Sequence, residues 1–389
     1  MSYSKSIHLS TILLLSITVL FIHSCSQDQN QDSYYSQSDD SGLLDTLLLK
    51  DWMPESVHNV QKTEITTAQY PIIDMHAHDY AKTEEELEKR IEIMDATGIE
   101  RSLVLTKKTG AAFESVYALY SKYPDRFDVY CGIDYTGYEE EGWSQKAAEQ
   151  IRRDVEAGCE GFGELHDKGE GMTSAPGMHP DDPRMDLIWQ TAAEMNLPVN
   201  LHVAEPIWMY EPMDSTNDGL TRAYTWRVQN QDQIVGHDGM IEILDRTLER
   251  HPNTTFVAAH LANTSNDFSL LADLFDKHEN FYADISARFA EFSTIPRTTA
   301  AFFEKYQDRI VYGTDYGFET FPDDPSKPYG NNTTTEEMLR MTFRVLQTAD
   351  EHFYMTDLVG YKWPMYGLDL SDEALQKIYR DNALKILSN

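Results

Sequence analysis

Side chains that could bind a metal ion recur at regular places along this sequence. His76 and His78 end a β-branched run, and because alternate residues of a strand point the same way, both imidazoles face one side together with Asp74. Neutral imidazoles with a carboxylate suit zinc, manganese or iron(II), and ligand-type residues at five strand ends predict a metal site. The other four such runs end with Glu164 and His166, with His202, with His260 and with Asp315.

The chemistry that this ligand set predicts is the activation of water. A bound divalent ion lowers the pKa of its water to about 7, so that hydroxide becomes available at neutral pH. Asp315 can accept that proton and later deliver it to a leaving group. His260, if it is not a ligand, can polarise a carbonyl group or stabilise an oxyanion.

The elements that must position these residues are strands that alternate with helices. Eight strands, each followed by a helical pattern, in about 320 residues fit one (β/α)8 TIM barrel better than an open sheet. In such barrels the active site lies at the C-terminal strand ends, where the ligand-type residues fall. The expected strands are 72–78, 101–107, 127–134, 160–166, 198–204, 254–260, 280–286 and 309–315.

Two further segments frame the barrel, which we expect to span residues 72–389. An extension over residues 43–71 precedes it, and an extra helix over residues 372–387 follows the eighth unit. The long segment from 205 to 235 follows the fifth strand, and long loops inside a compact domain are usually functional. Its aromatic residues Trp208, Tyr210 and Trp226 are candidates for the wall of a substrate pocket.

The N-terminal residues predict export. The apolar run 12–22 is too short to span a bilayer and has the length of a signal-peptide core. The sequence Ile-His-Ser-Cys that ends at Cys25 resembles a bacterial lipobox, which implies removal of residues 1–24 and a lipid on Cys25. Residues 25–42 are polar and read as a flexible tether. We expect a protein anchored by lipid alone to the bacterial outer membrane or cell surface, or otherwise a periplasmic one.

Charge and cysteine content narrow the possible partners. The chain has 65 Asp and Glu against 32 Lys and Arg, a formal charge of −33, which argues against nucleic acid as a partner. We therefore expect a small-molecule substrate. Cys131 and Cys159 have neither close spacing nor neighbouring histidines, which favours buried free thiols over a disulfide or a zinc site.

The segments IIDMHAH, GFGELH, PVNLHVAEP, DRIVYGTD and DEALQKIYRDNALKIL resemble the amidohydrolase superfamily. The resemblance covers nearly all of 47–389 and points to the amidohydrolase-related branch, which also contains aromatic-acid decarboxylases. It implies that His76, His78, His202 and Asp315 hold one metal ion. It further implies that His260 acts beside the metal on water or substrate.

Two positions leave alternatives open. Glu164 stands where related barrels, including TatD-type deoxyribonucleases, carry a metal-bridging glutamate, and in that case His260 would bind a second ion. In the other case Glu164 hydrogen-bonds His202 or a substrate group, and one metal per chain, which we favour, is sufficient. Arg288 lies just past the seventh strand, where its planar fork suits a substrate carboxylate, and a salt bridge is the alternative.

The function that follows is a metal-dependent hydrolase of a small organic substrate, such as an amide, a lactone or a related C–N, C–O or C–C bond. Zinc is the expected ion, with manganese or iron as substitutes. The first alternative is a non-oxidative decarboxylase that uses the same ligands. A TatD-type phosphodiesterase is disfavoured by the negative charge, and a non-catalytic binding lipoprotein is disfavoured by the complete ligand set.

Overall fold

The computed structural model describes residues 41–223, 227–315, 335–355 and 362–388. The chain forms two units, Met1–Asp51 and Trp52–Asn389. In the first unit the described residues form the short helices α1 (Ser41–Thr46) and η1 (Leu49–Asp51). The predicted signal peptide and lipobox, with Cys25, lie outside the described residues.

The second unit is built on eight parallel strands, one for each strand expected from the sequence. Strands β1, β2 and β3 pair in that order, and β10, β9, β8, β7 and β4 form a second run. These strands are β1 (Ile72–His78), β2 (Ile99–Leu105), β3 (Phe127–Tyr130), β4 (Phe162–Asp167), β7 (Val199–Val203), β8 (Phe256–Ala258), β9 (Phe281–Asp284) and β10 (Ile310–Val311).

Backbone hydrogen bonds join the two runs into one closed barrel. A parallel bridge between Cys131 and Phe162 links β3 to β4. On the other side, the Met75 N–H donates to the Tyr312 carbonyl at 2.9 Å, which links β1 to the end of β10. The predicted (β/α)8 barrel is therefore confirmed. Strands β5 (Gly171–Met172) and β6 (Ala175–Pro176) form a small antiparallel addition beside β4.

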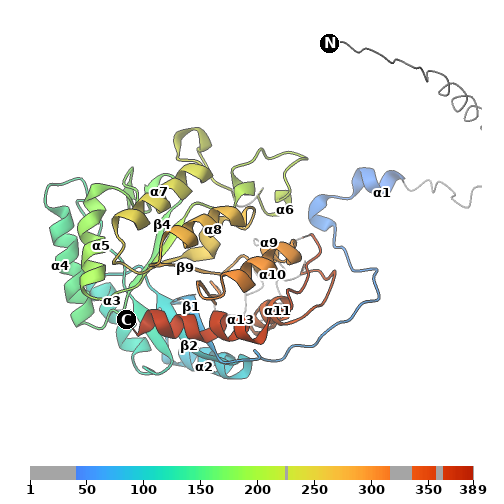
Figure 1. Ribbon diagram of the computed structural model, residues 1–389, viewed down its shortest axis with the longest axis horizontal. Helices are drawn as coiled ribbons and strands as arrows, with labels where there is room; N and C mark the ends of the chain where they lie inside the picture. Colours follow the sequence, from blue (N-terminus) through green and yellow to red (C-terminus); the bar gives the residue numbers. More distant parts are fainter. Residues whose placement is uncertain (1–40, 224–226, 316–334, 356–361, 389) are drawn as a thin grey trace, which may run out of the picture. The chain divides into compact units, whose positions relative to one another are not determined.

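Helices surround the strands, as Figure 1 shows. Helix α2 begins at Thr83 because its side chain accepts from the Glu86 N–H while the Glu86 carboxylate accepts from the Thr83 N–H, a capping box. The longer helices are α2 (Glu84–Thr97), α3 (Gly110–Tyr120), α4 (Trp143–Glu156), α5 (Asp186–Glu194), α7 (His237–Arg250), α8 (Phe268–Lys277), α10 (Pro296–Lys305) and α11 (Thr335–Gln347). Shorter helical segments are η2 (Pro183–Met185), η3 (Ile207–Met209), α6 (Leu220–Ala223), η4 (Gln231–Gln233), η5 (Ala259–Asn263) and α9 (Phe289–Phe292). Among the described residues, no helix is long and apolar enough to cross a membrane.

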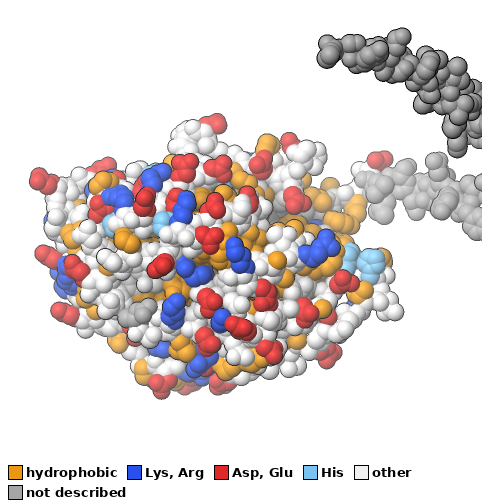
Figure 2. Space-filling view, viewed as in Figure 1, with side chains coloured by type: hydrophobic (Ala, Val, Ile, Leu, Met, Phe, Trp, Pro, Cys, Tyr) orange, Lys and Arg blue, Asp and Glu red, His pale blue; other side chains and the backbone are white. Residues whose placement is uncertain are grey.

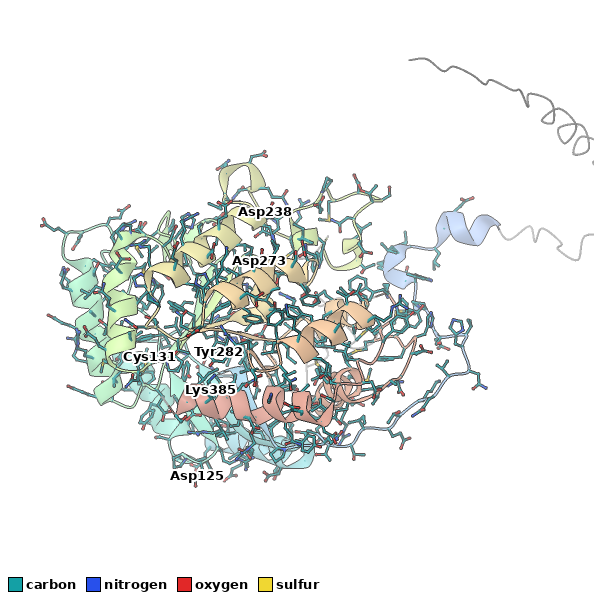
Figure 3. The ribbon with its side chains drawn as sticks, viewed as in Figure 1. Asp125, Cys131, Asp238, Asp273, Tyr282 and Lys385 are labelled. Atoms are coloured by element: carbon teal, nitrogen blue, oxygen red, sulfur yellow. A yellow bond between two sulfur atoms is a disulfide. The ribbon has the colours of Figure 1, made fainter. Side chains whose placement is uncertain are left out.

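The expected C-terminal helix is present as three consecutive pieces, α13 (Asp372–Gln376), the π-helical η6 (Lys377–Asp381) and α14 (Asn382–Leu387). The Asn382 amide donates to the carbonyl of Ile310, the first residue of β10, at 2.7 Å. Lys385 Nζ lies 5.5 Å from the ring centroid of Tyr282 in β9 (Figure 3). The helix thus packs against the end of the barrel where the strands begin, opposite to the ligand-type residues.

The prediction of free thiols is wrong, because Cys131 and Cys159 form a disulfide with Cα atoms 5.6 Å apart. Cys131 follows β3 and Cys159 precedes β4, and the two strands are neighbours in the barrel. The 28-residue separation along the chain conceals this proximity, which only the pairing of the strands creates. Both cysteines are buried, as expected.

The acidic character of the chain is spread over its surface. Figure 2 shows Asp and Glu side chains interspersed with Lys and Arg on the visible face. This arrangement agrees with a solvated acidic surface. The residues that could carry out chemistry are therefore the ones at the strand ends.

Candidate metal centre

Three of the four predicted ligands come together at the C-terminal end of the barrel. Asp315 Oδ1 lies 3.1 Å from His78 Nε2 and 3.6 Å from His76 Nε2. The backbone N–H of Asp315 donates to the His76 carbonyl at 2.8 Å, so that β1 itself positions the carboxylate. These side chains form a group that could hold a metal ion.

The ring nitrogen of each histidine that points away from the site has a fixed acceptor. His76 Nδ1 donates to Asp284 Oδ2 at 2.8 Å, and His78 Nδ1 donates to the Leu105 carbonyl at 2.9 Å. Carbonyl and carboxylate oxygens only accept hydrogen bonds, so the proton of each neutral ring lies on Nδ1. The lone pair of Nε2 is then directed into the site, which is the usual arrangement of a metal-binding histidine.

The residues present fit a divalent ion. His76 Nε2 is buried and makes no hydrogen bond to any described residue, which is costly for a polar atom unless a ligand uses it. The donor spacings of 3.1 and 3.6 Å resemble the edges of a coordination polyhedron. For ligands about 2.1 Å from an ion, such edges are about 3.0–3.4 Å long.

Charge in the site also calls for a cation. Burial alone would lower the pKa of His76, but the carboxylates of Asp284 and Glu164 raise it to about 10. Burial would raise the pKa of Asp315, yet the nearby imidazoles of His78, His76 and His260 hold it well below its usual range. The carboxylates therefore stay ionised and attract protons onto the imidazoles. A bound metal ion would replace such protons.

Glu164 lies at the centre of the histidine cluster. Its Oε1 is 2.6 Å from His202 Nδ1 and 3.3 Å from His260 Nε2, and its Oε2 is 3.6 Å from His78 Nε2. His202, the fourth predicted ligand, groups with Glu164 and His166 and not with the other three. The structure thus brings Glu164 to the position that a bridging or fourth ligand would require, and His202 beside it.

His260 lies in a left-handed turn. His260, Leu261, Ala262 and Asn263 have φ values of 61°, 54°, 51° and 55°, which is uncommon for residues other than glycine and typical of functional sites. The His260 backbone N–H donates to the Asp284 carboxylate at 3.0 Å, and its Nδ1 lies 3.0 Å from the Ser286 carbonyl. Burial and the charge of His202 lower the pKa of His260. The lowered pKa favours the neutral ring, whose Nε2 lies 3.3 Å from Glu164 Oε1.

The predicted substrate residues Arg288 and Trp208 share a cleft. Arg288 is only 2 % exposed, and its guanidinium is engaged with Asn263 Oδ1 at 3.0 Å, Glu205 Oε2 at 3.8 Å and Glu291 Oε1 at 3.6 Å. These contacts agree with the alternative in which Arg288 forms salt bridges within the protein instead of binding a substrate carboxylate. Trp208 and Arg288 both line a cleft of about 500 Å³. Trp226 lies outside the described residues.

Sequence reasoning missed two supports of the site. Asp284 accepts from His76 and from the backbone of His260, although the sequence marked it only as part of a strand. Lys107, at the end of β2, places its Nζ 3.3 Å from Glu164 Oε2 and 2.8 Å from His166 Nε2. The same rule that found His76, a polar residue at a strand end, would have found Lys107.

These features define a barrel enzyme with a metal centre at its C-terminal face, and the chain belongs to the amidohydrolase family, whose model matches residues 58–388. It is therefore a metal-dependent enzyme of the amidohydrolase family. No curated protein matches the chain.

Similar folds occur among solved structures. An uncharacterized TIM-barrel protein from Bordetella bronchiseptica is 15 % identical with a TM-score of 0.51, covering 82 % of this chain and 98 % of its own. A proposed amidohydrolase from Staphylococcus aureus is 14 % identical with a TM-score of 0.52, covering 82 % and 100 %. The 2,6-dihydroxybenzoate decarboxylase from Rhizobium is 16 % identical with a TM-score of 0.48, covering 82 % and 99 %. At such identities the first two likenesses establish the barrel fold alone.

Proposed function

We propose that this protein is a hydrolase of a small organic substrate that uses one divalent ion, held by His76, His78 and Asp315. The observation that carries the proposal is the buried Nε2 of His76, which makes no hydrogen bond to a described residue and lies 3.6 Å from Asp315 Oδ1. Zinc suits this set of two imidazoles and one carboxylate, and manganese or iron are the substitutes.

Glu164 and His202 complete the proposed centre. The Glu164 carboxylate faces His78 at 3.6 Å and His202 at 2.6 Å, so it can serve as a further ligand that His202 orients. If Glu164 bridges two ions, His202 and His260, which both lie close to its Oε1, would be the candidate ligands of the second ion. The number of metal ions per chain distinguishes the one-ion from the two-ion arrangement.

The ion, when bound, would act as a Lewis acid that makes hydroxide available at neutral pH. Asp315 is one-quarter exposed and ionised, so its carboxylate can accept a proton from water and pass it to a leaving group. The Nε2 of His260 lies 3.3 Å from Glu164 Oε1, where it can exchange a proton or orient a substrate carbonyl through water. His260 is buried, which limits the access of bulk water to its ring.

A substrate screen tests this proposal. Metal-loaded protein should hydrolyse at least one member of a panel of amides, lactones and esters, and Asp315→Asn should lose about 10²-fold or more in kcat. The same panel should include aromatic and unsaturated acids with a direct assay for released carbon dioxide. Decarboxylation without any hydrolysis would replace our proposal by the carboxy-lyase alternative.

We further propose that the protein is exported and anchored by a lipid on Cys25. Two features support this: the apolar run 12–22 before Cys25, and the disulfide between Cys131 and Cys159, a bond that persists in oxidising compartments. Cells that make the Cys25→Ser protein should yield it without a lipid label and outside the membrane fraction. Equal lipid labelling of the Cys25→Ser and parent proteins would contradict the proposal.

A further inference from the structure

Lys107 brings a positive charge into the centre of a strongly acidic protein. It follows β2, and its side chain is 41 % exposed while its Nζ lies 3.3 Å from Glu164 Oε2. The formal charge of the whole chain is −33, so a cation at this place is against the general trend. An acidic protein that uses anionic substrates needs such a local cation.

The backbone holds Lys107 in a defined place. Its N–H donates to the Gly163 carbonyl of β4 at 3.2 Å. Gly132 packs directly against it, because a Cβ atom at Gly132 would lie 2.3 Å from the Lys107 carbonyl oxygen. The ammonium group therefore starts from a fixed point at the strand end, which reduces the entropy that binding would cost.

The contacts of the ammonium group leave it capacity for a ligand. His166 Nε2 lies 2.5 Å from Glu164 Oε2 and 2.8 Å from Lys107 Nζ, and one ring nitrogen can serve only one of these partners at a time. If the His166 Nε2 proton is donated to Glu164, this nitrogen cannot accept from Lys107. Of these two partners, Lys107 then retains only Glu164. If Glu164 in turn binds the metal ion, the ion takes up its charge, and the ammonium group needs another anion.

There is space for that anion beside His166. A cleft of about 390 Å³ is lined by His166, Lys168, Glu205 and Arg227, among others. Lys168 contacts the Glu205 carboxylate, and Glu170 also lines the cleft. Both cations and acids thus line the cleft, and Lys107 Nζ lies 2.8 Å from His166 Nε2, a residue of its wall.

We infer that Lys107 binds a carboxylate of the substrate, next to the metal centre. This inference rests on the proposed metal-dependent function and adds the substrate class to it: a small molecule with a carboxylate near the reacting bond. It moves the role that the sequence suggested for Arg288, which is 2 % exposed, to a more exposed cation whose Nζ lies 3.3 Å from Glu164 Oε2.

Binding of a matched pair of probes tests the inference without any activity assay. Succinate and its monoamide succinamate have nearly the same shape and differ by one negative charge. In calorimetric titrations at low salt, metal-loaded wild-type protein should bind succinate about tenfold more tightly than succinamate, the scale of one charge-assisted hydrogen bond. In Lys107→Gln this ratio should fall below about twofold, and in Lys107→Arg it should be largely retained.

Lys122→Gln is the control, because Lys122 is similarly exposed, at 46 %, and pairs with Glu84 away from the site. It should keep the tenfold ratio. A ratio that persists in Lys107→Gln, or no discrimination in the wild type, would overturn the inference. So would loss of bound metal from Lys107→Gln, since Lys107 would then only support Glu164. Wild-type protein that binds no metal would instead overturn the proposed function.

Discussion

Asp284 links two of the active-site histidines to the barrel. It is fully buried in β9, and its carboxylate accepts from His76 Nδ1, from the His260 backbone and from the Asn200 amide. Partners of this kind set the tautomer of a ligand histidine and raise its basicity. The candidate ligands could be placed at strand ends from the strand pattern, but this partner could not be found, because it becomes visible only when β1 and β9 are placed in one barrel.

Asp284→Asn should therefore weaken metal binding by about 10- to 100-fold, since an amide cannot accept from all of these donors. The measurement is a competition titration against a chelator. Asp245→Asn is the matched control, because Asp245 accepts from His278 at 2.7 Å in a carboxylate–histidine pair that includes none of the proposed ligands. Equal metal affinity in Asp284→Asn and wild type would contradict this assignment.

His260 should matter for turnover more than for metal retention. With its Nδ1 held by the Ser286 carbonyl and its Nε2 3.3 Å from Glu164 Oε1, it is placed to move a proton beside the ion. We expect His260→Ala to lower kcat by about 10²-fold or more and to keep the bound metal. A His260→Ala protein that loses metal would show that His260 is a ligand and would favour the two-ion arrangement.

At the scale of elements, Asp167 joins β4 to the β5–β6 hairpin. Its Oδ1 accepts from the Gly169 and Gly171 N–H groups at 2.9 and 3.0 Å, and its Oδ2 lies 2.6 Å from His179 Nδ1. This last hydrogen bond raises the pKa of His179, although burial opposes the shift.

A raised histidine pKa stabilises the fold below the unfolded value of about 6.5, and this stabilisation is lost as the pH rises through the folded value. His179→Gln should therefore lower the free energy of unfolding more at pH 5.5 than at pH 8.5. Urea denaturation at the two pH values measures the difference. An equal loss of unfolding free energy at both pH values would mean that the charge of His179 contributes nothing to stability.

The disulfide joins β3 to β4 at the seam between the two strand runs. Because it closes a loop of 28 residues, we expect Cys159→Ser to lower the free energy of unfolding by about 2–4 kcal/mol. Urea denaturation without reductant gives this difference. Adding reductant should bring the wild type to the level of Cys159→Ser, and a wild-type protein indifferent to reductant would contradict the expectation.

At the scale of the whole molecule, the sequence was sufficient for the architecture. All eight strands and the C-terminal helix lie where the alternation of β-branched runs and helical patterns put them, because each is a local pattern. The Cys131–Cys159 disulfide and the separation of His202 from the group of His76, His78 and Asp315 were not predictable in this way. Both depend on which strands are neighbours and on how side chains turn at the barrel rim, which no local pattern encodes.

The central claim is that the strand-end cluster of the whole protein holds a divalent ion. Elemental analysis of the purified full chain tests it most directly. We predict one divalent ion per chain in the wild type, near zero in His76→Ala, and one in the control His278→Ala, whose histidine pairs with Asp245. Two ions lost together in Glu164→Ala would show the bridged arrangement. An active wild-type protein without a divalent ion, or a His76→Ala protein that keeps it, would contradict the claim.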